Sequence, residues 1–393
     1  MRILFVQKET GYLYGGVENH VRELVKRLAA RGHEVTLLTR GGPAHPLKEL
    51  ESLKNVKIVY LSQTSARTKR AASMRGLAAK TIAGSLRLTA LLRRTKALPW
   101  LAKTIPWIFS HRKEFDVVSV HTFTDTVAMR AINRVARMPY AAWLEGYDYI
   151  EAENAKKSRV VATISEYMYG LCSRVHGYRP MVIPIGVDRQ KFQNVNPREV
   201  KKARKKYART GELLVLNVAR LTESKGIPNM VKAAALARKK RGDLKFVVCG
   251  DGEQRPLLDK MVRELRLGDC FYIVKAFGSE LPAFYNAADI FVHVPKFGNH
   301  FGVVYLEAMA AGLPIVAANA EASPLTVGDA ALLVETENPR ALADAITRLA
   351  ENKALREKLS EKADRRAREK FDWGKIIVEC EKLYKKAIAA YGG

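Results

Sequence analysis

The stretch IFVHVPKFGNHFGVVYLEAMAAGLPIVA, residues 290–317, carries the pattern that decides the fold. It begins with three apolar residues followed by His293, a run typical of a buried strand, residues 304–311 have helical composition, and residues 314–317 read as a second short strand. A glycine-containing loop, residues 298–302, connects the first strand to the helix. A strand, a helix and a second strand in this order predict a parallel βαβ unit.

The same alternation of strands and helices covers most of the chain. Short apolar strands are predicted near residues 3–6, 35–38, 56–61, 117–120, 140–144, 160–164, 181–183, 213–217, 245–249, 290–293, 314–317 and 331–334. Helical stretches separate most of them. The pattern therefore predicts an α/β protein with two Rossmann-like, doubly wound parallel-sheet lobes and a cleft between them.

The boundary between the two lobes is predicted in a charged segment without strand pattern, residues 186–207. We expect an N-terminal lobe at 1–188, a C-terminal lobe at 189–371, and a last helix at 372–393 that packs back on the N-terminal lobe. A length of 393 residues suits two domains of ordinary size.

The composition indicates a reducing compartment. Four widely spaced cysteines show neither disulfide nor metal spacing, so we expect free thiols: Cys172, Cys249, Cys270 and Cys380. The N-terminal MRILFVQKETG lacks the apolar region of a signal peptide, and the chain has no run of about 18 uncharged apolar residues. The sequence therefore predicts a cytoplasmic protein that does not span a membrane.

The formal net charge of +27 predicts a negatively charged partner: nucleic acid, anionic lipid or a phosphorylated substrate. The charge is concentrated in a segment at about 62–113, and no Asp or Glu occurs from Leu53 to Lys113. Basic and aromatic residues mixed without acids favour contact with an anionic membrane surface. The membrane-contact candidates are Arg93, Arg94, Lys96, Trp100 and Trp107. The alternative is one or two ordinary surface helices of the first lobe.

A pair of cations follows one predicted strand of the second lobe. The segment NVARLTESKG, residues 217–226, brings Arg220 and Lys225 to the loop between a strand and the next helix. Ligands of open α/β sheets bind at this carboxyl edge, and two fixed cations there could hold a diphosphate as a leaving group. The alternative is two solvated loop charges.

Two further segments suggest ligand binding. Glu307 lies about one turn inside the helix that follows the loop 298–302, where its carboxylate could accept hydrogen bonds from a ribose diol. Alternatively it only complements the helix dipole. The pair Gly15-Gly16 stands between a strand and a helix, where bare N–H groups attract anions, or where a turn needs positive φ.

These motifs, in this order, resemble the retaining glycosyltransferases of family 4, which have the GT-B fold. The likeness covers nearly the whole chain and rests on residues 15–18 (GGVE), 116–121 (DVVSVH), 183–188 (IPIGVD), 219–226 (ARLTESKG), 249–252 (CGDG), 285–289 (YNAAD) and 301–314 (FGVVYLEAMAAGLP). Seven matches in the family's order are specific.

The resemblance implies that the C-terminal lobe binds a nucleotide-sugar donor and the N-terminal lobe an acceptor. It implies catalytic roles for His121, Arg220 and Lys225. The donor-binding residues it implies are Gly15, Gly16, Asn299, His300, Phe301, Gly302, Val303 and Glu307. It implies neither a metal ion nor a cofactor, with a UDP- or GDP-sugar as the substrate. A lone histidine such as His121 can also be purely structural.

The chain departs from the family pattern at several positions. Asn299 stands where the family usually has Glu, Glu145 where it has the His of an HG pair, Ser119 where it has the first His of its strand motif, and Ile185 where it has Asn. An amide donates as well as accepts, so Asn299 is expected to favour an acetamido or uronic acid sugar over a simple hexose.

The sequence thus predicts a metal-independent hexosyl- or N-acetylhexosaminyl-transferase at the inner face of the cell membrane. The family resemblance implies that the transfer retains the configuration at the anomeric carbon. A lipid-linked or phospholipid acceptor is expected because of the basic segment. One alternative is a sugar-nucleotide 2-epimerase of the same fold, which would need carboxylates for proton abstraction. The other is a basic nucleic-acid-binding protein, for which no motif is found, and nucleic acid is not an expected partner.

Overall fold

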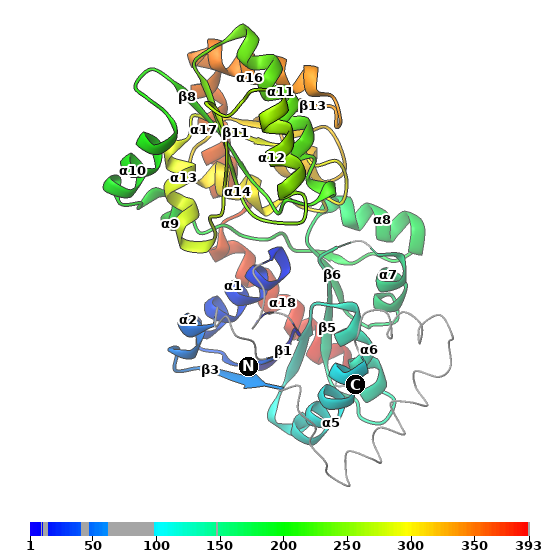
Figure 1. The fold of residues 1–393 in the computed structure, drawn as a ribbon. Coiled ribbons are helices and arrows are strands. Elements are labelled where there is room, and N and C mark those ends of the chain that lie inside the picture. The colour runs from blue at the N-terminus through cyan, green and yellow to red at the C-terminus, as the bar shows by residue number, and fades with distance from the viewer. Residues whose placement is uncertain (9, 11–14, 41–46, 62–97, 147, 392–393) are drawn as a thin grey trace. The chain divides into compact units, whose positions relative to one another are not determined.

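The computed structural model describes residues 1–8, 10, 15–40, 47–61, 98–146 and 148–391. The chain divides into two compact units (Figure 1). The first contains residues 1–164, 168–183 and 377–393, and the second contains 165–167 and 184–376.

The first unit is built on a seven-stranded parallel sheet of order β3-β2-β1-β4-β5-β6-β7. The strands are β1 (Arg2–Val6), β2 (Glu34–Thr39), β3 (Val56–Tyr60), β4 (Val117–Val120), β5 (Tyr140–Leu144), β6 (Val161–Thr163) and β7 (Met181–Val182). The central strands β4 and β5 are buried along their whole length, as expected for a sheet with both faces covered.

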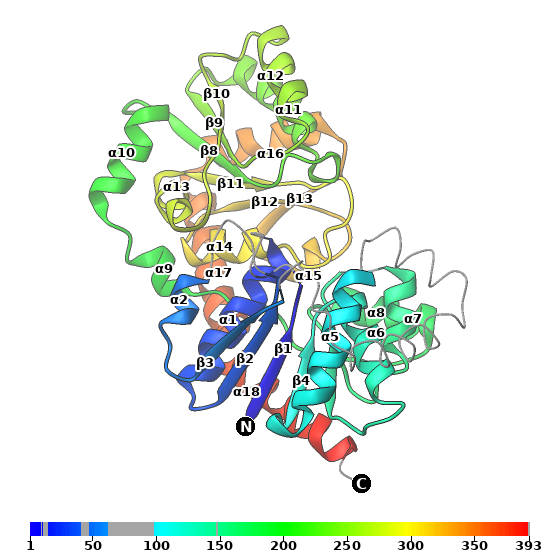
Figure 2. The same ribbon diagram turned by 60° about the horizontal axis from the view of Figure 1, so that its bottom comes forward.

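The helices of this unit connect successive strands. They are α1 (Gly16–Ala30), α2 (Lys48–Glu51), α5 (Leu98–His111), α6 (Phe123–Ile132), α7 (Tyr149–Ala155) and α8 (Glu166–His176). The last helix of the chain, α18 (Trp373–Tyr391), belongs to this unit from Ile377 on. It lies beside α1 in Figures 1 and 2. A hydrogen bond joins the two helices, because Arg31 at the end of α1 donates to Glu381 of α18 at 2.6 Å.

The second unit has a six-stranded parallel sheet of order β10-β9-β8-β11-β12-β13. Its strands are β8 (Leu213–Val218), β9 (Leu244–Cys249), β10 (Phe271–Val274), β11 (Ile290–His293), β12 (Ile315–Ala318) and β13 (Ala331–Val334). Its helices are α9 (Arg189–Gln193), α10 (Pro197–Tyr207), α11 (Ile227–Lys240), α12 (Arg255–Glu264), α13 (Leu281–Ala287), α14 (Val303–Ala310), α15 (Ser323–Val327), α16 (Pro339–Glu351) and α17 (Lys353–Lys370). The predicted class of two Rossmann-like parallel sheets is confirmed.

The strand orders place one topological switch point in each sheet. The order reverses between β1 and β4 in the first unit and between β8 and β11 in the second. Loops that leave neighbouring strands there diverge to opposite faces of the sheet, which opens a crevice for ligands at the carboxyl edge. Every residue with a predicted catalytic or donor-binding role lies after one of these four strands.

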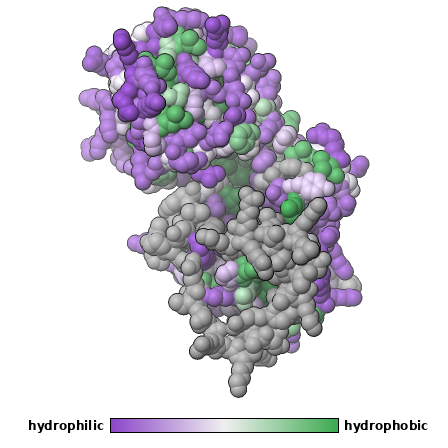
Figure 3. Space-filling view, turned by 45° about the vertical axis from the view of Figure 1, so that its right-hand side comes forward, coloured by the Kyte–Doolittle hydropathy of each residue, from purple (hydrophilic) through white to green (hydrophobic). Residues whose placement is uncertain are grey.

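The hydrophilic surface and the free cysteines agree with what the amino-acid composition predicted. Figure 3 shows mostly hydrophilic side chains on the visible face of the second unit. All four cysteines are buried free thiols, as predicted. Within the described residues, no helix combines the length and the apolar character needed to cross a membrane.

Candidate functional site

The loop between β8 and α11 presents two cations without an anionic partner. Arg220 follows β8, and Lys225 ends a short 3₁₀ turn, Glu223–Lys225, just before α11. Across the described part of the chain, neither side chain forms a hydrogen bond or a salt bridge. Burial, followed by the charge of Arg220, lowers the pKa of Lys225, while Glu321 acts in the opposite direction. An anion bound here would therefore stabilise both charges.

The backbone at Gly226 keeps this loop close to the next one. Gly226 has φ +65°, and a Cβ atom at this position would lie 2.7 Å from the carbonyl oxygen of Val294. The loop after β11 also bonds to the first loop directly, since the amide of Lys296 donates to the carbonyl oxygen of Ser224 at 2.8 Å. The two loops that flank the switch point are thus held together.

The loop after β11 opens helix α14 with bare N–H groups. Gly302 is the N-cap with φ +86°, and no side chain caps the helix. A Cβ atom at Gly302 would approach the ring of Tyr305 to 2.5 Å, so glycine is required there. Val303 begins the helix, while Phe301 is buried and accepts a hydrogen bond from Thr326 at its carbonyl oxygen. Uncapped N–H groups at a helix start favour an anion.

Glu307 lies in α14 and is held by a residue that the sequence did not single out. Tyr285 on α13 donates from its hydroxyl to the Glu307 carboxylate at 2.7 Å. Burial raises the pKa of Glu307, and the Tyr285 hydrogen bond opposes this shift. The YNAAD motif contains Tyr285, but its spacing does not reveal the partner.

Asn299 and His300 precede the glycine of this loop. Asn299 is 4% exposed, and its side-chain amide donates to the hydroxyl of Ser323 at 2.7 Å. The imidazole of His300 has its pKa lowered by burial. The backbone amides of Gly298 and Asn299 donate to the carboxylate of Glu321 on the loop after β12. Glu321 is therefore a further member of this site, and sequence reasoning missed it.

In the first unit, Gly15 and Gly16 precede and begin helix α1. Gly15 is an extended N-cap with φ −137°, and no side chain caps the helix. Neither glycine has positive φ, so the alternative of a turn that requires left-handed backbone does not apply.

His121 lies directly after β4 in a buried cluster of aromatic and polar side chains. Its ring is stacked between Phe5 and Trp143, each with centroids 5.5 Å away. Its Nδ1 lies 2.6 Å from Glu145, and its Nε2 lies 2.8 Å from the hydroxyl of Ser119. The residue is 2% exposed. Its catalytic role stays a prediction, and in this arrangement both ring nitrogens already have partners.

The direction of the hydrogen bonds around His121 follows from its charge. Burial lowers the pKa of His121, so the neutral imidazole is favoured. The Nδ1–H group donates to the Glu145 carboxylate, which leaves Nε2 as the acceptor for the Ser119 hydroxyl. Ser119 in turn accepts from Tyr384 of α18 at 3.0 Å. A chain of bonds thus connects the last helix to the edge of the sheet.

His20 of α1 joins this cluster, a grouping that spacing along the chain did not predict. Its Nδ1 lies 3.0 Å from the Glu145 carboxylate, and one ligand atom from each of His20, His121 and Glu145 lies within 4.8 Å of the others. This donor set could hold a cation. The 2.6 Å contact of His121 with Glu145 is a hydrogen bond, and the 3.0 Å contact of His20 with the same carboxylate is at ion-pair distance.

The structure corrects the assignment of Trp100 as a membrane contact. Trp100 is 5% exposed, lies in the core of the first unit and donates to the buried carboxylate of Asp125 at 2.8 Å. Trp107 is half-buried and stacks on His111. Helix α5 therefore packs an apolar face into the unit, as in the alternative of an ordinary helix. Arg93, Arg94 and Lys96 lie outside the described residues.

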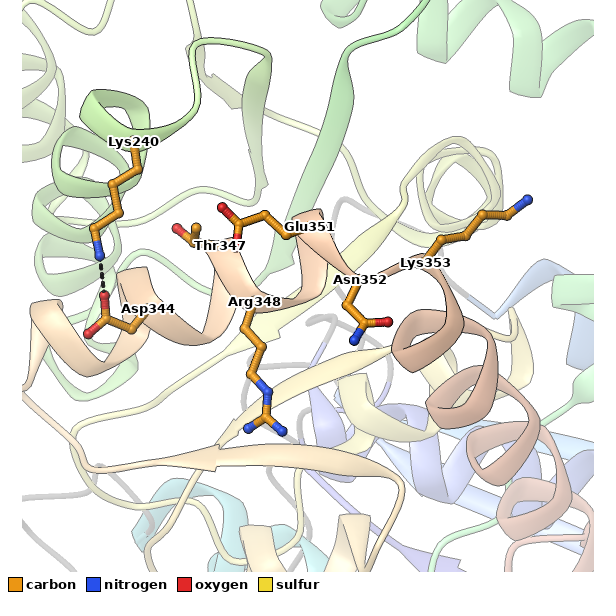
Figure 4. A pocket seen from close by; sticks show the side chains of 7 residues that line it. All are labelled: Lys240, Asp344, Thr347, Arg348, Glu351, Asn352 and Lys353. Atoms are coloured by element: carbon orange, nitrogen blue, oxygen red, sulfur yellow. Dashed lines mark hydrogen bonds and ion pairs between the residues drawn. The ribbon is translucent and has the colours of Figure 1, made fainter.

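A pocket elsewhere in the second unit contains none of the motif residues. Lys240 of α11 forms a salt bridge with Asp344 of α16 at 2.7 Å, and Figure 4 shows the pocket extending along α16 to Lys353. Its lining is polar and charged. The candidate residues lie at the switch point of each sheet, and none of them lines this pocket.

Known protein families match both halves of the chain. Residues 14–191 match the glycosyltransferase family 4 domain, and residues 199–366 match the glycosyl transferases group 1 domain. The chain belongs to glycosyltransferase family 4. It is a glycosyltransferase of the GT-B type, as the resemblance implied.

Relatives of this glycosyltransferase extend over almost its whole length. D-inositol 3-phosphate glycosyltransferase from Salinispora arenicola is 28% identical and aligns with 96% of this chain and 88% of its own. Glycogen synthase from Mycobacterium tuberculosis is 24% identical over 98% and 94% of the two chains.

Solved structures share its fold. HepE of Anabaena in complex with UDP has a TM-score of 0.77 at 18% identity and covers 98% of this chain and 100% of its own. Sucrose-phosphate synthase from Thermosynechococcus elongatus has a TM-score of 0.78 at 19% identity and covers 99% of both chains.

Proposed function

We propose that this glycosyltransferase moves a sugar from a nucleoside-diphosphate donor to a phosphorylated alcohol, with retention at the anomeric carbon and without a metal ion. The observation that carries the proposal is the pair Arg220 and Lys225, two neighbouring cations with neither a hydrogen bond nor a salt bridge in the described structure. A diphosphate supplies the missing negative charge.

The proposed chemistry assigns a role to each group of the second unit. The bond between the anomeric carbon and the phosphate oxygen breaks, and negative charge accumulates on the leaving diphosphate. Arg220, Lys225 and the open N–H groups of α14 stabilise this charge more strongly as it develops. Glu307, oriented by Tyr285, accepts hydrogen bonds from the ribose. The acceptor hydroxyl oxygen forms the new bond to the anomeric carbon, and its proton passes to the departing diphosphate oxygen.

Two observations support a phosphorylated acceptor: the net charge of the protein and the names of its relatives. A net charge of +27 favours a phosphate-bearing acceptor. Relatives with 28% identity are named D-inositol 3-phosphate glycosyltransferases. An inositol phosphate and a lipid-linked phosphate both carry the negatively charged phosphate that such a protein would attract. The lipid-linked acceptor and a place on the inner face of the cell membrane are the second candidate, because the segment 62–113 is rich in Arg and Lys.

The test is product analysis with purified protein. UDP-, GDP- and ADP-sugars are each incubated with inositol 3-phosphate, with a polyprenyl phosphate in vesicles, and with no acceptor. We expect a glycoside whose anomeric proton shows the donor's configuration by NMR, and equal rates with and without EDTA. Release of an epimerised sugar without an acceptor would instead support the 2-epimerase, and no reaction in any arm would refute the proposal.

A further inference from the structure

Glu321 has a backbone conformation that glutamate rarely adopts. It lies on the loop between β12 and α15 with φ 51°, in the left-handed region where a Cβ atom is unfavourable. Such conformations persist where the surroundings hold them in place, and they concentrate at functional sites. The conformation alone does not identify a function, but it shows that the position of this side chain is enforced.

The carboxylate of Glu321 is fixed against the loop that opens α14. One oxygen accepts from the amide of Gly298 at 3.0 Å, and the other accepts from the amide of Asn299. A carboxylate has about four lone-pair directions. Two backbone bonds therefore leave acceptor capacity for two hydroxyl groups.

The same carboxylate lies within electrostatic reach of the proposed phosphate site. Its charge raises the pKa of Lys225 and of His300, against the lowering caused by their burial. The sugar of a nucleotide sugar is bonded directly to the second phosphate. A carboxylate that lies near both Lys225 and the start of α14 is therefore well placed to contact the hydroxyls of the sugar ring.

Asn299 does not present a comparable group. Its amide nitrogen donates to Ser323, and the residue is 4% exposed. The family motif has a carboxylate at position 299, and this chain has an amide turned into the interior. Glu321, from a different loop, brings a carboxylate to the backbone of that same position.

We infer that Glu321 accepts hydrogen bonds from the hydroxyls of the donor sugar and so selects a neutral, hydroxyl-bearing hexose over a uronic acid. This inference rests on the proposed function. Glu321 is a specificity residue here, and the loss of Glu at position 299 is offset by a residue 22 positions further along. A uronate would place like charge beside this carboxylate, which is unfavourable.

The test separates sugar binding from diphosphate binding. Calorimetric titrations measure Kd for UDP, GDP and ADP and for their glucose conjugates with wild type, Glu321→Gln and Glu321→Gly. Glu321→Gly also relieves the left-handed strain, so a folded variant without the carboxylate is available. Glu337→Gly is the matched control, because Glu337 has φ 56° but pairs with Lys296.

We expect both Glu321 variants to bind the preferred nucleoside diphosphate within about twofold of wild type and its glucose conjugate about tenfold or more weakly. Glu337→Gly should bind both like wild type. The preference for UDP-glucose over UDP-glucuronate should shrink in Glu321→Gln. If the Glu321 variants bind the glucose conjugate as tightly as wild type does, or lose as much affinity for the free nucleoside diphosphate, the inference about Glu321 is wrong. The proposed function would not be affected by either result. If wild type binds no nucleotide in the series, the proposed function fails first.

Discussion

The hydroxyl of Tyr285 donates to the carboxylate of Glu307 across 2.7 Å, which joins helix α13 to helix α14. Glu307 is the residue predicted to bind the donor ribose, and burial raises its pKa. The Tyr285 hydrogen bond favours the charged form and fixes its orientation. A buried residue outside the ligand contact is thus expected to set the affinity of the site.

Replacing Tyr285 by Phe should raise the donor KM about three- to tenfold and leave kcat nearly unchanged, because a ribose contact is similar in the ground and transition states. Steady-state kinetics with varied donor measure both constants. Tyr272→Phe is the control, since its hydroxyl bonds to the carbonyl oxygen of Asp269 outside the site. An equal change in both variants would contradict the assignment.

Arg220→Ala and Lys225→Ala should each lower kcat about a hundredfold or more, since each removes a preorganised charge at the departing phosphate. Lys240→Ala is the matched control, because Lys240 is already paired with Asp344. Its turnover should equal that of wild type. Wild-type rates for Arg220→Ala or Lys225→Ala would refute the diphosphate site.

Donor affinity should decline in the alkaline range, and the decline should begin at a lower pH than it would if Lys225 had the pKa of an ordinary lysine. The free-enzyme pKa of Lys225 is lowered by burial and by Arg220, so its ammonium is lost below the usual value of about 10.4. The donor KM should therefore rise with pH in wild type. Lys225→Arg keeps its charge and should flatten this rise. The same alkaline profile in both proteins would exclude Lys225 as the titrating group.

Stability of the first unit should fall on acidification because of the His121 cluster. Burial lowers the pKa of His121, so the unfolded chain binds more protons below about pH 6.5 and folding weakens there. The pKa of Glu145 is lowered to about 2, chiefly by its two histidine neighbours against the effect of burial, so its contribution is present above about pH 4.5 and is lost towards pH 2.

Glu145→Gln should lower the free energy of unfolding at neutral pH by about 1 to 3 kcal/mol and remove the part of its acid dependence that falls between about pH 4.5 and pH 2. Urea unfolding at a series of pH values measures both effects. The exposed Glu335→Gln serves as the control. An acid dependence identical to that of wild type would show that Glu145 is not a source of the linkage.

The membrane proposal predicts binding to vesicles that contain anionic lipid and release by salt. Each basic residue near such a surface contributes about 1 kcal/mol. Replacing Arg93, Arg94 and Lys96 by Glu should weaken sedimentation with these vesicles and leave donor hydrolysis unaffected. The same change at Lys201, Lys202 and Lys205 of the basic helix α10 is the control for total charge. Equal binding to neutral vesicles would contradict the proposal.

The sequence by itself determined the two parallel sheets and the segments that carry the site. Hydrophobic periodicity and glycine positions are local properties, and they predicted the strands and helices around β8 and β11. Arg220 and Lys225 follow because they stand in the loop directly after β8, and Glu307 follows because it stands in the first helix after β11. The start of a helix after a parallel strand places such side chains at the carboxyl edge whatever the rest of the chain does.

Only the tertiary structure decided which distant residues meet. The contacts of Tyr285 with Glu307, of Glu321 with the amides of Gly298 and Asn299, and of His20 with Glu145 join different elements. They depend on strand order and on the direction of each side chain, and neither leaves a periodic signal in one sequence. For the same reason, Trp100 was predicted to contact a membrane because it stands beside basic residues. It is instead a core residue, packed among residues of other elements and hydrogen-bonded to Asp125 on another helix.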